Sequence, residues 1–249
     1  MSSSRSSKSA AIVGKKKANP APVDSEQPAW YSCRGWHFDK ARNYDFVDKN
    51  GASHVYVNDD RYKYVHGRIR VFIQKRLEEY YGFVKIPVPP NKKADPATCA
   101  QVYASPDVFV NANLLVIVQG LGDVYPGVWA RKLFTNGRAD NFKHATQFPY
   151  VRKALSYGWA VVLCDPNHDG DTPNSRKRHV RRVWEDVIKR FVASNVMFVA
   201  FSAGTWATLA MLDLEDNNEA KKNFLRLVQA VVLLDGAVGH EKYDEWLTA

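Results

Sequence analysis

Long apolar runs and cysteines are both scarce in this 249-residue chain. No run reaches the roughly 18 apolar residues that a membrane-spanning helix needs, so we expect no membrane contact. The three cysteines, Cys33, Cys99 and Cys164, are too few for a disulfide framework and lack the spacing of metal ligands. A reducing compartment is the simpler interpretation, and neither a metal nor another cofactor is expected.

Acidic residues are also fewer than basic ones. The chain has 35 Lys and Arg and 26 Asp and Glu, which gives a net charge of +9. The chain carries no acid before Asp24, and a second basic concentration spans Arg176 to Arg182. Such a charge permits attraction to nucleic acid or acidic proteins without establishing it. No zinc-finger or RNA-recognition signature accompanies the charge.

Residues 1–28 are rich in Ser, Lys, Ala and Pro and poor in bulky apolar side chains, which predicts a disordered basic tail. Residues 29–249 are long enough for one core and are predicted to form a single domain. The Lys15–Lys17 cluster suits a nuclear or nucleo-cytoplasmic protein. The acid-free, Ser- and Arg-containing start suits a mitochondrial address instead, and both interpretations stay open. No apolar segment typical of a secretory signal is present.

The first part of the domain predicts a mixture of strands and one long helix. Asn50-Gly51 is a hairpin signal within the segment from Phe38 to Val57. A helix is expected from Asp59-Asp60 onward, because apolar residues then recur at intervals of three and four. A strand over 84–88 and a polar loop over 91–98 follow.

The remaining chain alternates apolar strands with helices. Strands are predicted over 114–118, 159–164, 196–200 and 228–234, and helices over 128–134, 148–157, 178–193 and 217–224. Strands that lack polar alternation indicate a parallel sheet covered by helices on both faces. We therefore predict an α/β fold with a doubly wound, mostly parallel sheet of α/β-hydrolase type. One clear strand follows the 196–200 strand, so this sheet is expected to be truncated at its C-terminal end.

Ser202 occupies the position of a catalytic nucleophile in that fold. The run Ala200-Phe201-Ser202-Ala203-Gly204 joins an apolar strand to a helix, as a nucleophile elbow does, with Ala200 in place of the usual first glycine. The backbone N–H of Ala203 is a candidate oxyanion donor. A second donor is expected from the loop after the 114–118 strand, namely Gly120, Leu121 or Gly122.

A general base and an orienting acid are harder to assign. Asp235 ends the 228–234 strand and is the candidate acid, and His240 follows five residues later. His179, one turn into a predicted helix, is the alternative base. His168 lies where open α/β sheets bind ligands, and a hydrogen-bonded loop histidine explains it equally. Asp165, Asp169 and Asp171 resemble part of a calcium loop, but the remaining EF-hand pattern is missing, so no metal is assigned.

The densest basic run outside the tail is a candidate binding face for nucleic acid or an acidic partner. It comprises Arg176, Lys177, Arg178, Arg181 and Arg182. Helical spacing places Arg178, Arg181 and Arg182 on one side, with the apolar stripe inward. A solvated helix face explains the same run without any partner.

Several ordered motifs resemble the Argonaute-binding protein two domain family. They are Asn50-Gly51 through Tyr56, Tyr80-Tyr81, Val84 to Pro89, Val116 to Gly120, Pro126 to Arg131, Gln147 to Tyr150 and Asp165 to Asn167. The family includes a subunit of a fission-yeast Argonaute siRNA chaperone complex, animal cotranscriptional regulators and domains attached to fungal class II histone deacetylases. The resemblance covers residues 35–248. It implies an α/β-hydrolase fold used in RNA-linked gene regulation in the nucleus.

Two functional hypotheses follow. The first is a non-catalytic, α/β-hydrolase-like scaffold in a protein or ribonucleoprotein assembly, linked to Argonaute or to cotranscriptional regulation and with weak RNA contact. The second is a serine esterase-like hydrolase with Ser202 as its nucleophile. The missing late strands favour the first hypothesis, because they would normally carry the acid and the histidine.

Overall fold

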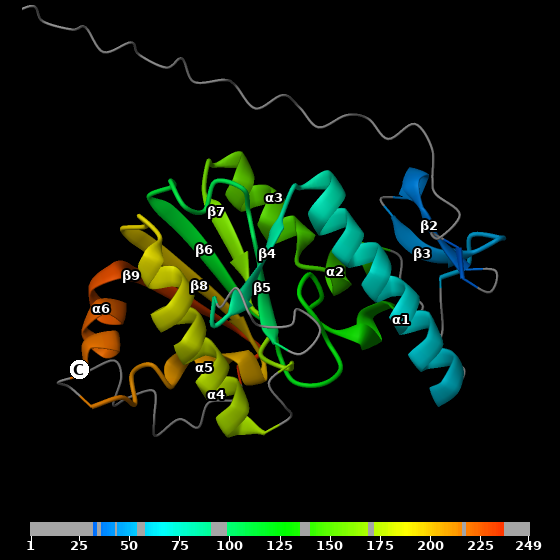
Figure 1. Ribbon diagram of the computed structural model, residues 1–249. Helices are drawn as coiled ribbons and strands as arrows, with labels where there is room; N and C mark the ends of the chain where they lie inside the picture. The colour runs from blue at the N-terminus through cyan, green and yellow to red at the C-terminus, as the bar shows by residue number, and fades with distance from the viewer. Residues whose placement is uncertain are drawn as a thin grey trace, which may run out of the picture.

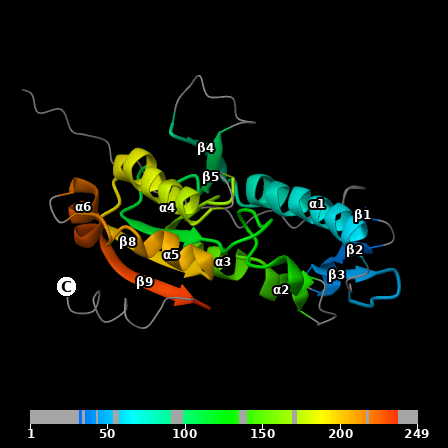
Figure 2. The same ribbon diagram turned by 90° about the horizontal axis from the view of Figure 1, so that it is seen from below.

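A computed structural model describes residues 32–33, 36–42, 44–53, 58–90, 99–134, 140–168, 172–215 and 218–236. The predicted disordered tail and His240 lie outside these residues. The described chain forms a small three-stranded sheet and a larger six-stranded sheet with helices around it. In both Figure 1 and Figure 2, the small sheet and α1 lie at one end of the molecule and α6 and β9 at the other.

The larger sheet has the strand order β4-β5-β7-β6-β8-β9. Its strands are β4 (Val84–Val88), β5 (Ala100–Ala104), β6 (Asn113–Val118), β7 (Ala160–Leu163), β8 (Asn195–Phe201) and β9 (Val228–Leu234). The first two pairings are antiparallel, and the three pairings among β7, β6, β8 and β9 are parallel. The predicted α/β fold with a mostly parallel sheet is therefore confirmed.

Two apolar layers cover the two faces of this sheet. Leu115 and Ile117 of β6 pack into a layer with α1 (Asp59–Lys75) and α3 (Phe148–Ser156). Leu114, Val116 and Val118 of β6 point the other way, into a layer with α4, α5 and α6. Because both faces of β6, β7 and β8 are largely buried, these strands contain no polar alternation. The bounds of the remaining helices are α2 (Asn141–Ala145), α4 (Pro173–Arg182), α5 (Ala203–Leu209) and α6 (Glu219–Leu227).

The small sheet packs against the N-terminal part of the helical layer. Its strands are β1 (Ser32–Cys33), β2 (Trp36–Asp39) and β3 (Asp45–Asp48), all antiparallel, with the single turn η2 (Lys40–Arg42) between β2 and β3. Phe38 of β2 stacks on Phe72 of α1 with 3.8 Å between ring centroids. The predicted Asn50-Gly51 turn is present: Gly51 has φ +79°, and Asp48 N–H donates to Ala52 O.

The helical segments differ from the predicted ones in three places. Val128 to Phe134 contains only the short 3-10 turn η4 (Arg131–Phe134). The helix predicted from Arg178 begins at Pro173, because Thr172 Oγ1 accepts the Ser175 N–H and caps it. That helix then continues as a π-helical turn, η5 (Val183–Val187), and a 3-10 turn, η6 (Ile188–Arg190). Likewise α1 ends in the π-helical turn η3 (Arg76–Tyr80).

Strand β5 has no counterpart in the sequence prediction. Its residues, Ala-Gln-Val-Tyr-Ala, form no continuous apolar run. The strand is nevertheless well buried, because it pairs with β4 on one side and with β7 on the other. Pairing to an existing sheet thus supplied the stability that local propensity did not indicate.

Gly204 provides a test of this architecture. A Cβ at this position would lie 2.6 Å from both Val118 O and Gln119 O, which are backbone atoms that cannot rotate away. We expect Gly204→Ala to lower the free energy of unfolding by about 2 kcal/mol or more, measured by denaturant titration. Gly67→Ala is the matched control. Gly67 lies in exposed helix with nothing within 4 Å of its Cβ position, so this change should stabilise by up to about 1 kcal/mol. Equal effects of the two substitutions would contradict the packing argument.

Candidate functional site

Ser202 sits at the tip of a strained turn between β8 and α5. Its backbone has φ 51° and ψ −123°, a conformation that non-glycine residues rarely adopt. Such a residue costs about 1–3 kcal/mol and persists only where surrounding contacts hold it. Those contacts are present: Ser202 N–H donates to Leu234 O at 2.9 Å, and Thr205 Oγ1 donates to Ser202 O at 2.6 Å. The predicted elbow shape is therefore real.

The loop after β6 lies directly against this elbow. A Cβ built on Gly120 would approach Ser202 Cβ to 3.0 Å, so only glycine fits there without displacement. Ala203 is the first residue of α5, and its N–H has no acceptor within the helix. Gly122 adopts φ +106° in the same loop, and Leu121 is exposed. Gly120 and Ala203 thus lie beside Ser202, and the role of the four candidate oxyanion donors stays a prediction.

His179 supports the loop after β7. It lies on α4 and is fully buried, and its Nε2 accepts a hydrogen bond from the backbone N–H of Asp165 at 3.2 Å. An imidazole nitrogen that accepts such a hydrogen bond has no lone pair left to take the proton of a serine hydroxyl. This contact weighs against His179 as the general base, and that role stays a prediction.

Asp235 and an unpredicted histidine share a cavity of about 480 Å³ at the ends of β8 and β9. Phe201, the residue before Ser202, also lines this cavity, as does His144 of α2. Asp235 has φ 49°, which turns the chain sharply at the end of β9. His144 follows no motif and precedes Ser202 in the chain, so the sequence offered no signal for it. In the described part of the chain, no hydrogen bond is found for Ser202 Oγ.

A larger cavity of about 620 Å³ opens where β6 and β7 end. It is lined by the loop from Leu121 to Tyr125, by Asp165, Asn167 and His168, and by Arg70 of α1. His168 is therefore at a cavity, as its position after a central strand suggested. Ser202 is not among the lining residues, so this cavity and the elbow lie beside each other without sharing the serine.

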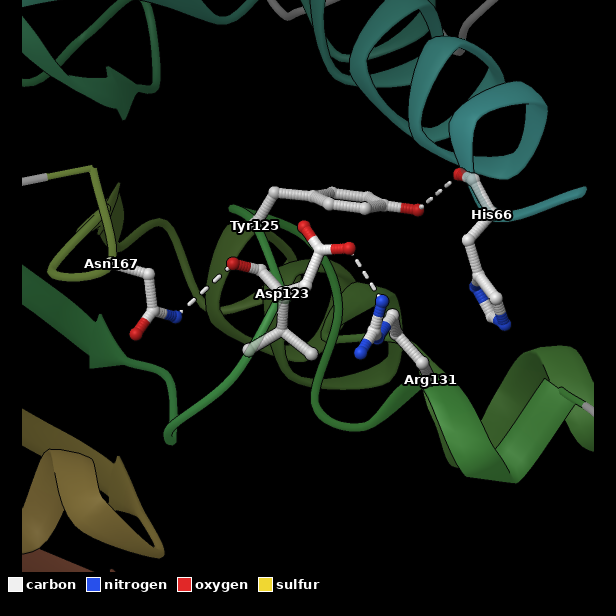
Figure 3. A network of polar contacts seen from close by, with 6 residues as sticks. His66, Asp123, Tyr125, Arg131 and Asn167 are labelled. Atoms are coloured by element: carbon white, nitrogen blue, oxygen red, sulfur yellow. Dashed lines mark hydrogen bonds and ion pairs between the residues drawn. The ribbon is translucent and has the colours of Figure 1, made fainter. Parts of the chain in front are cut away.

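Asn167 organises the wall of this cavity. Its Nδ2 donates to Gly120 O at 2.9 Å and to Val124 O at 3.1 Å, and its Oδ1 accepts Arg176 Nε at 3.2 Å. The contact with Val124 is drawn in Figure 3. One amide thereby ties the loop after β6 to the loop after β7 and to α4. Since Gly120 also packs on Ser202, Asn167 indirectly supports the elbow.

Figure 3 also shows Asp123 and Tyr125 of the same loop with their polar partners. Asp123 forms an ion pair with Arg131, and Tyr125 OH donates to His66 O at 3.3 Å. Burial raises the pKa of Tyr125 well above its usual range, with Arg70 opposing that shift. The phenol is therefore neutral at physiological pH and serves as a hydrogen-bond donor that anchors the loop to α1.

The predicted basic face is divided by the fold. Arg176 is only 3% exposed and donates a hydrogen bond to Asn167, so its side chain is not part of that exposed surface. Arg181 is exposed and forms an ion pair with Glu185 at 2.9 Å. Arg178 and Arg182 remain exposed, and Lys177 is half-buried. A smaller cationic surface than predicted is left, and its binding role stays a prediction.

The described ranges contain neither a candidate metal-binding cluster nor a helix suited to cross a membrane. Within them, no group of three or more His, Cys, Asp or Glu side chains could hold a metal ion. Asp169 and Asp171, which belong to the part of the sequence that resembles a calcium loop, lie outside those ranges. No described helix combines the length and apolar character that crossing a membrane requires.

Comparison with known proteins identifies one family. The Arb2 domain matches residues 38–169. A FAM172 family protein homolog from Caenorhabditis elegans is 34% identical over 129 residues, which cover 49% of this chain and 40% of that protein. The human cotranscriptional regulator ARB2A is 28% identical over 126 residues, covering 50% of this chain and 29% of the human protein. The match thus spans less than half the length of these relatives.

Two histone deacetylases are among the solved structures whose backbones resemble this chain. One from Saccharomyces cerevisiae has a TM-score of 0.47 and 14% sequence identity, over 77% of this chain and 79% of that chain. The histone deacetylase Clr3 has a TM-score of 0.47 and 18% identity, over 71% of this chain and 28% of that chain.

Asn167→Ala tests the loop arrangement. The substitution removes two donated hydrogen bonds and the acceptor for Arg176, so we expect a loss of about 2–4 kcal/mol in unfolding free energy. Amide hydrogen exchange should also accelerate in residues 120–124. His168→Ala is the control, because His168 is the exposed next residue on the same loop; its effect should stay within about 0.5 kcal/mol. Unchanged exchange in residues 120–124 would show that Asn167 does not hold the loop.

Proposed function

Because the chain belongs to the Arb2 domain family, we propose that it is a non-catalytic, α/β-hydrolase-like scaffold in an assembly that regulates gene expression. The observation that carries this proposal is the environment of Ser202. The serine has the strained backbone of a nucleophile, yet no hydrogen bond to its Oγ is found in the ranges that the structure describes. A serine hydroxyl needs a general base to become a nucleophile at neutral pH.

The positions of two candidate bases, His179 and His168, support the same proposal. His179 is committed to a backbone N–H of the loop after β7. His168 lines the larger cavity, whose lining does not include Ser202. The elbow then has a structural purpose: it places α5 close to β6, which the absence of a side chain at Gly204 allows.

The relatives point to the assembly. Human ARB2A is named a cotranscriptional regulator, and proteins of the same name occur in other animals. We propose that this chain acts likewise in the nucleus, in an Argonaute-linked or cotranscriptional complex. The mitochondrial alternative gains no support from these relatives.

A serine esterase-like hydrolase is the second candidate, and one observation favours it. Asp235 and His144 line one cavity together with Phe201, the residue that precedes Ser202 in the chain. In this arrangement His144 would be the base and Asp235 the acid, and Ala203 N–H with the loop from Gly120 to Gly122 would stabilise the oxyanion.

A fluorophosphonate probe separates the two candidates. We expect no labelling of the full chain above that of Ser202→Ala, because labelling requires an activated hydroxyl. An active serine esterase treated in parallel provides the positive control. Labelling that disappears in both Ser202→Ala and His144→Ala would establish the esterase and remove the scaffold hypothesis.

Co-purification tests the assembly. The tagged full chain, expressed in cells of its source and recovered from nuclear extract, should carry Argonaute or cotranscriptional proteins identified by mass spectrometry. Ser202→Ala should recover the same proteins in the same amounts, since a scaffold does not use the hydroxyl. Recovery of neither class of protein would contradict the proposal, as would partners that are lost with Ser202→Ala.

A further inference from the structure

Three cations from three different helical segments converge on one small hollow on the α1–α3 side of the molecule. They are Arg76, the first residue of η3, Lys143 of α2 and Arg152 of α3. Tyr44, Tyr80 and Tyr81 contribute aromatic rings to the same hollow. We call this group of six side chains the Arg76 hollow. No carboxylate is present among the described residues that line it.

Arg76 is held in a fixed orientation by aromatic rings. Its guanidinium carbon lies 4.0 Å from the centroid of Tyr44 and 4.4 Å from that of Tyr80. Stacking of this kind occupies the faces of the guanidinium and leaves its in-plane N–H donors available. These donors match the geometry of two oxygens of a phosphate or carboxylate group.

The three cations lack ionic partners in the described chain. Ion pairs there join Lys85 with Glu78, Arg131 with Asp123 and Arg181 with Glu185, and none includes Arg76, Lys143 or Arg152. Lys143 and Arg152 are exposed, whereas Arg76 is half-buried. Uncompensated like charges repel one another, so an anion seated between them would relieve a cost that the free protein carries.

Tyr81 adds a neutral donor to the hollow. Its ring stacks on Phe148 with 5.3 Å between centroids, which fixes the position of the hydroxyl. Burial raises the pKa of Tyr81 to about 12, although Arg76 and Arg152 pull it down. The hydroxyl therefore keeps its proton at physiological pH, and it has no hydrogen-bond partner in the described ranges.

The size of the hollow restricts what enters it. Its volume is about 90 Å³, which is much smaller than the two cavities at the ends of the sheet strands. This small space suits a single tetrahedral anion. Bases attached to such an anion would stay on the rim, where the ring of Tyr80 is 37% exposed. Aromatic rings beside a cationic groove are the usual platform for unpaired bases.

We propose that the Arg76 hollow binds a backbone phosphate of single-stranded RNA, with the adjoining bases against Tyr80. The cationic and aromatic lining favours RNA over an acidic peptide, because a peptide carboxylate would use the cations and leave the exposed ring unused. The site differs from the face around Arg178 and Arg182. The proposal names RNA as a direct partner of the proposed scaffold. The choice of RNA as the ligand rests on that proposed function.

Charge reversal at the hollow tests the proposal against a matched control. Lys143→Glu with Arg152→Glu should weaken binding of a fluorescent single-stranded oligouridine RNA about tenfold or more in anisotropy titrations of the full chain. The negative slope of log affinity against log salt concentration should become shallower by about 1 to 2. Lys189→Glu with Arg190→Glu makes the same change in net charge at two exposed residues outside the hollow, and should alter affinity by less than about threefold. Circular dichroism checks that each variant is folded, and the Gln–Gln pair at 143 and 152 replaces the Glu–Glu pair if that one unfolds.

A positional readout completes the test. RNA containing 4-thiouridine should crosslink to Tyr80 or Tyr81, identified by mass spectrometry, and the crosslink should disappear with the Lys143 and Arg152 substitutions.

Equal loss of affinity in both charge-reversed pairs would overturn the site, as would wild-type protein that does not bind the RNA. Polyglutamate that displaces the RNA as effectively as unlabelled RNA would assign the hollow to an acidic protein instead. None of these outcomes depends on probe labelling of Ser202 or on co-purified proteins, so the scaffold proposal succeeds or fails separately.

Discussion

The close backbone contact between α5 and the end of β6 is the constraint on which the elbow region depends. Gly204 has no side chain, so the carbonyl oxygens of Val118 and Gln119 approach the start of α5. The approach leaves Ser202 between β8 and the loop after β6, where its strained backbone is held by Leu234 O and Thr205. Gly120 must in turn be small, because it packs on Ser202 and Phe201. One close contact therefore sets the conformation of two loops.

Helix α4, which lies in the same apolar layer as α5, also stabilises this region. A buried polar group costs free energy unless it is hydrogen-bonded, and α4 places two such groups inside. Arg176 bonds to Asn167, which holds Gly120, and His179 accepts the N–H of Asp165. The loops after β6 and β7 are therefore tied to α4 by side chains that resemble functional residues in the sequence. Their burial shows that they maintain the shape of the carboxyl edge of the sheet.

The sequence predicted most of this fold because its central strands are fully buried. Strands β6, β7 and β8 appear as apolar runs, and the turn at Ser202 follows from the residues around it. Strand β5 was missed, since its stability comes from pairing with β4 and β7. Arg176 was placed on the surface because a run of basic residues gives charge without direction. The Arg76 hollow was not predicted, because its three cations come from three separate segments and meet only in the folded chain.

The elbow shows that a catalytic shape and catalytic chemistry have different physical requirements. The shape depends on local contacts: a small residue at 204, a glycine at 120 and hydrogen bonds to Ser202 itself. The chemistry needs a histidine from a distant segment, held within hydrogen-bond reach of Ser202 Oγ. Loss of that histidine would leave every contact that maintains the elbow in place. The strained backbone of this serine therefore follows from the packing of α5 on β6. It indicates catalysis only where a general base lies beside the serine.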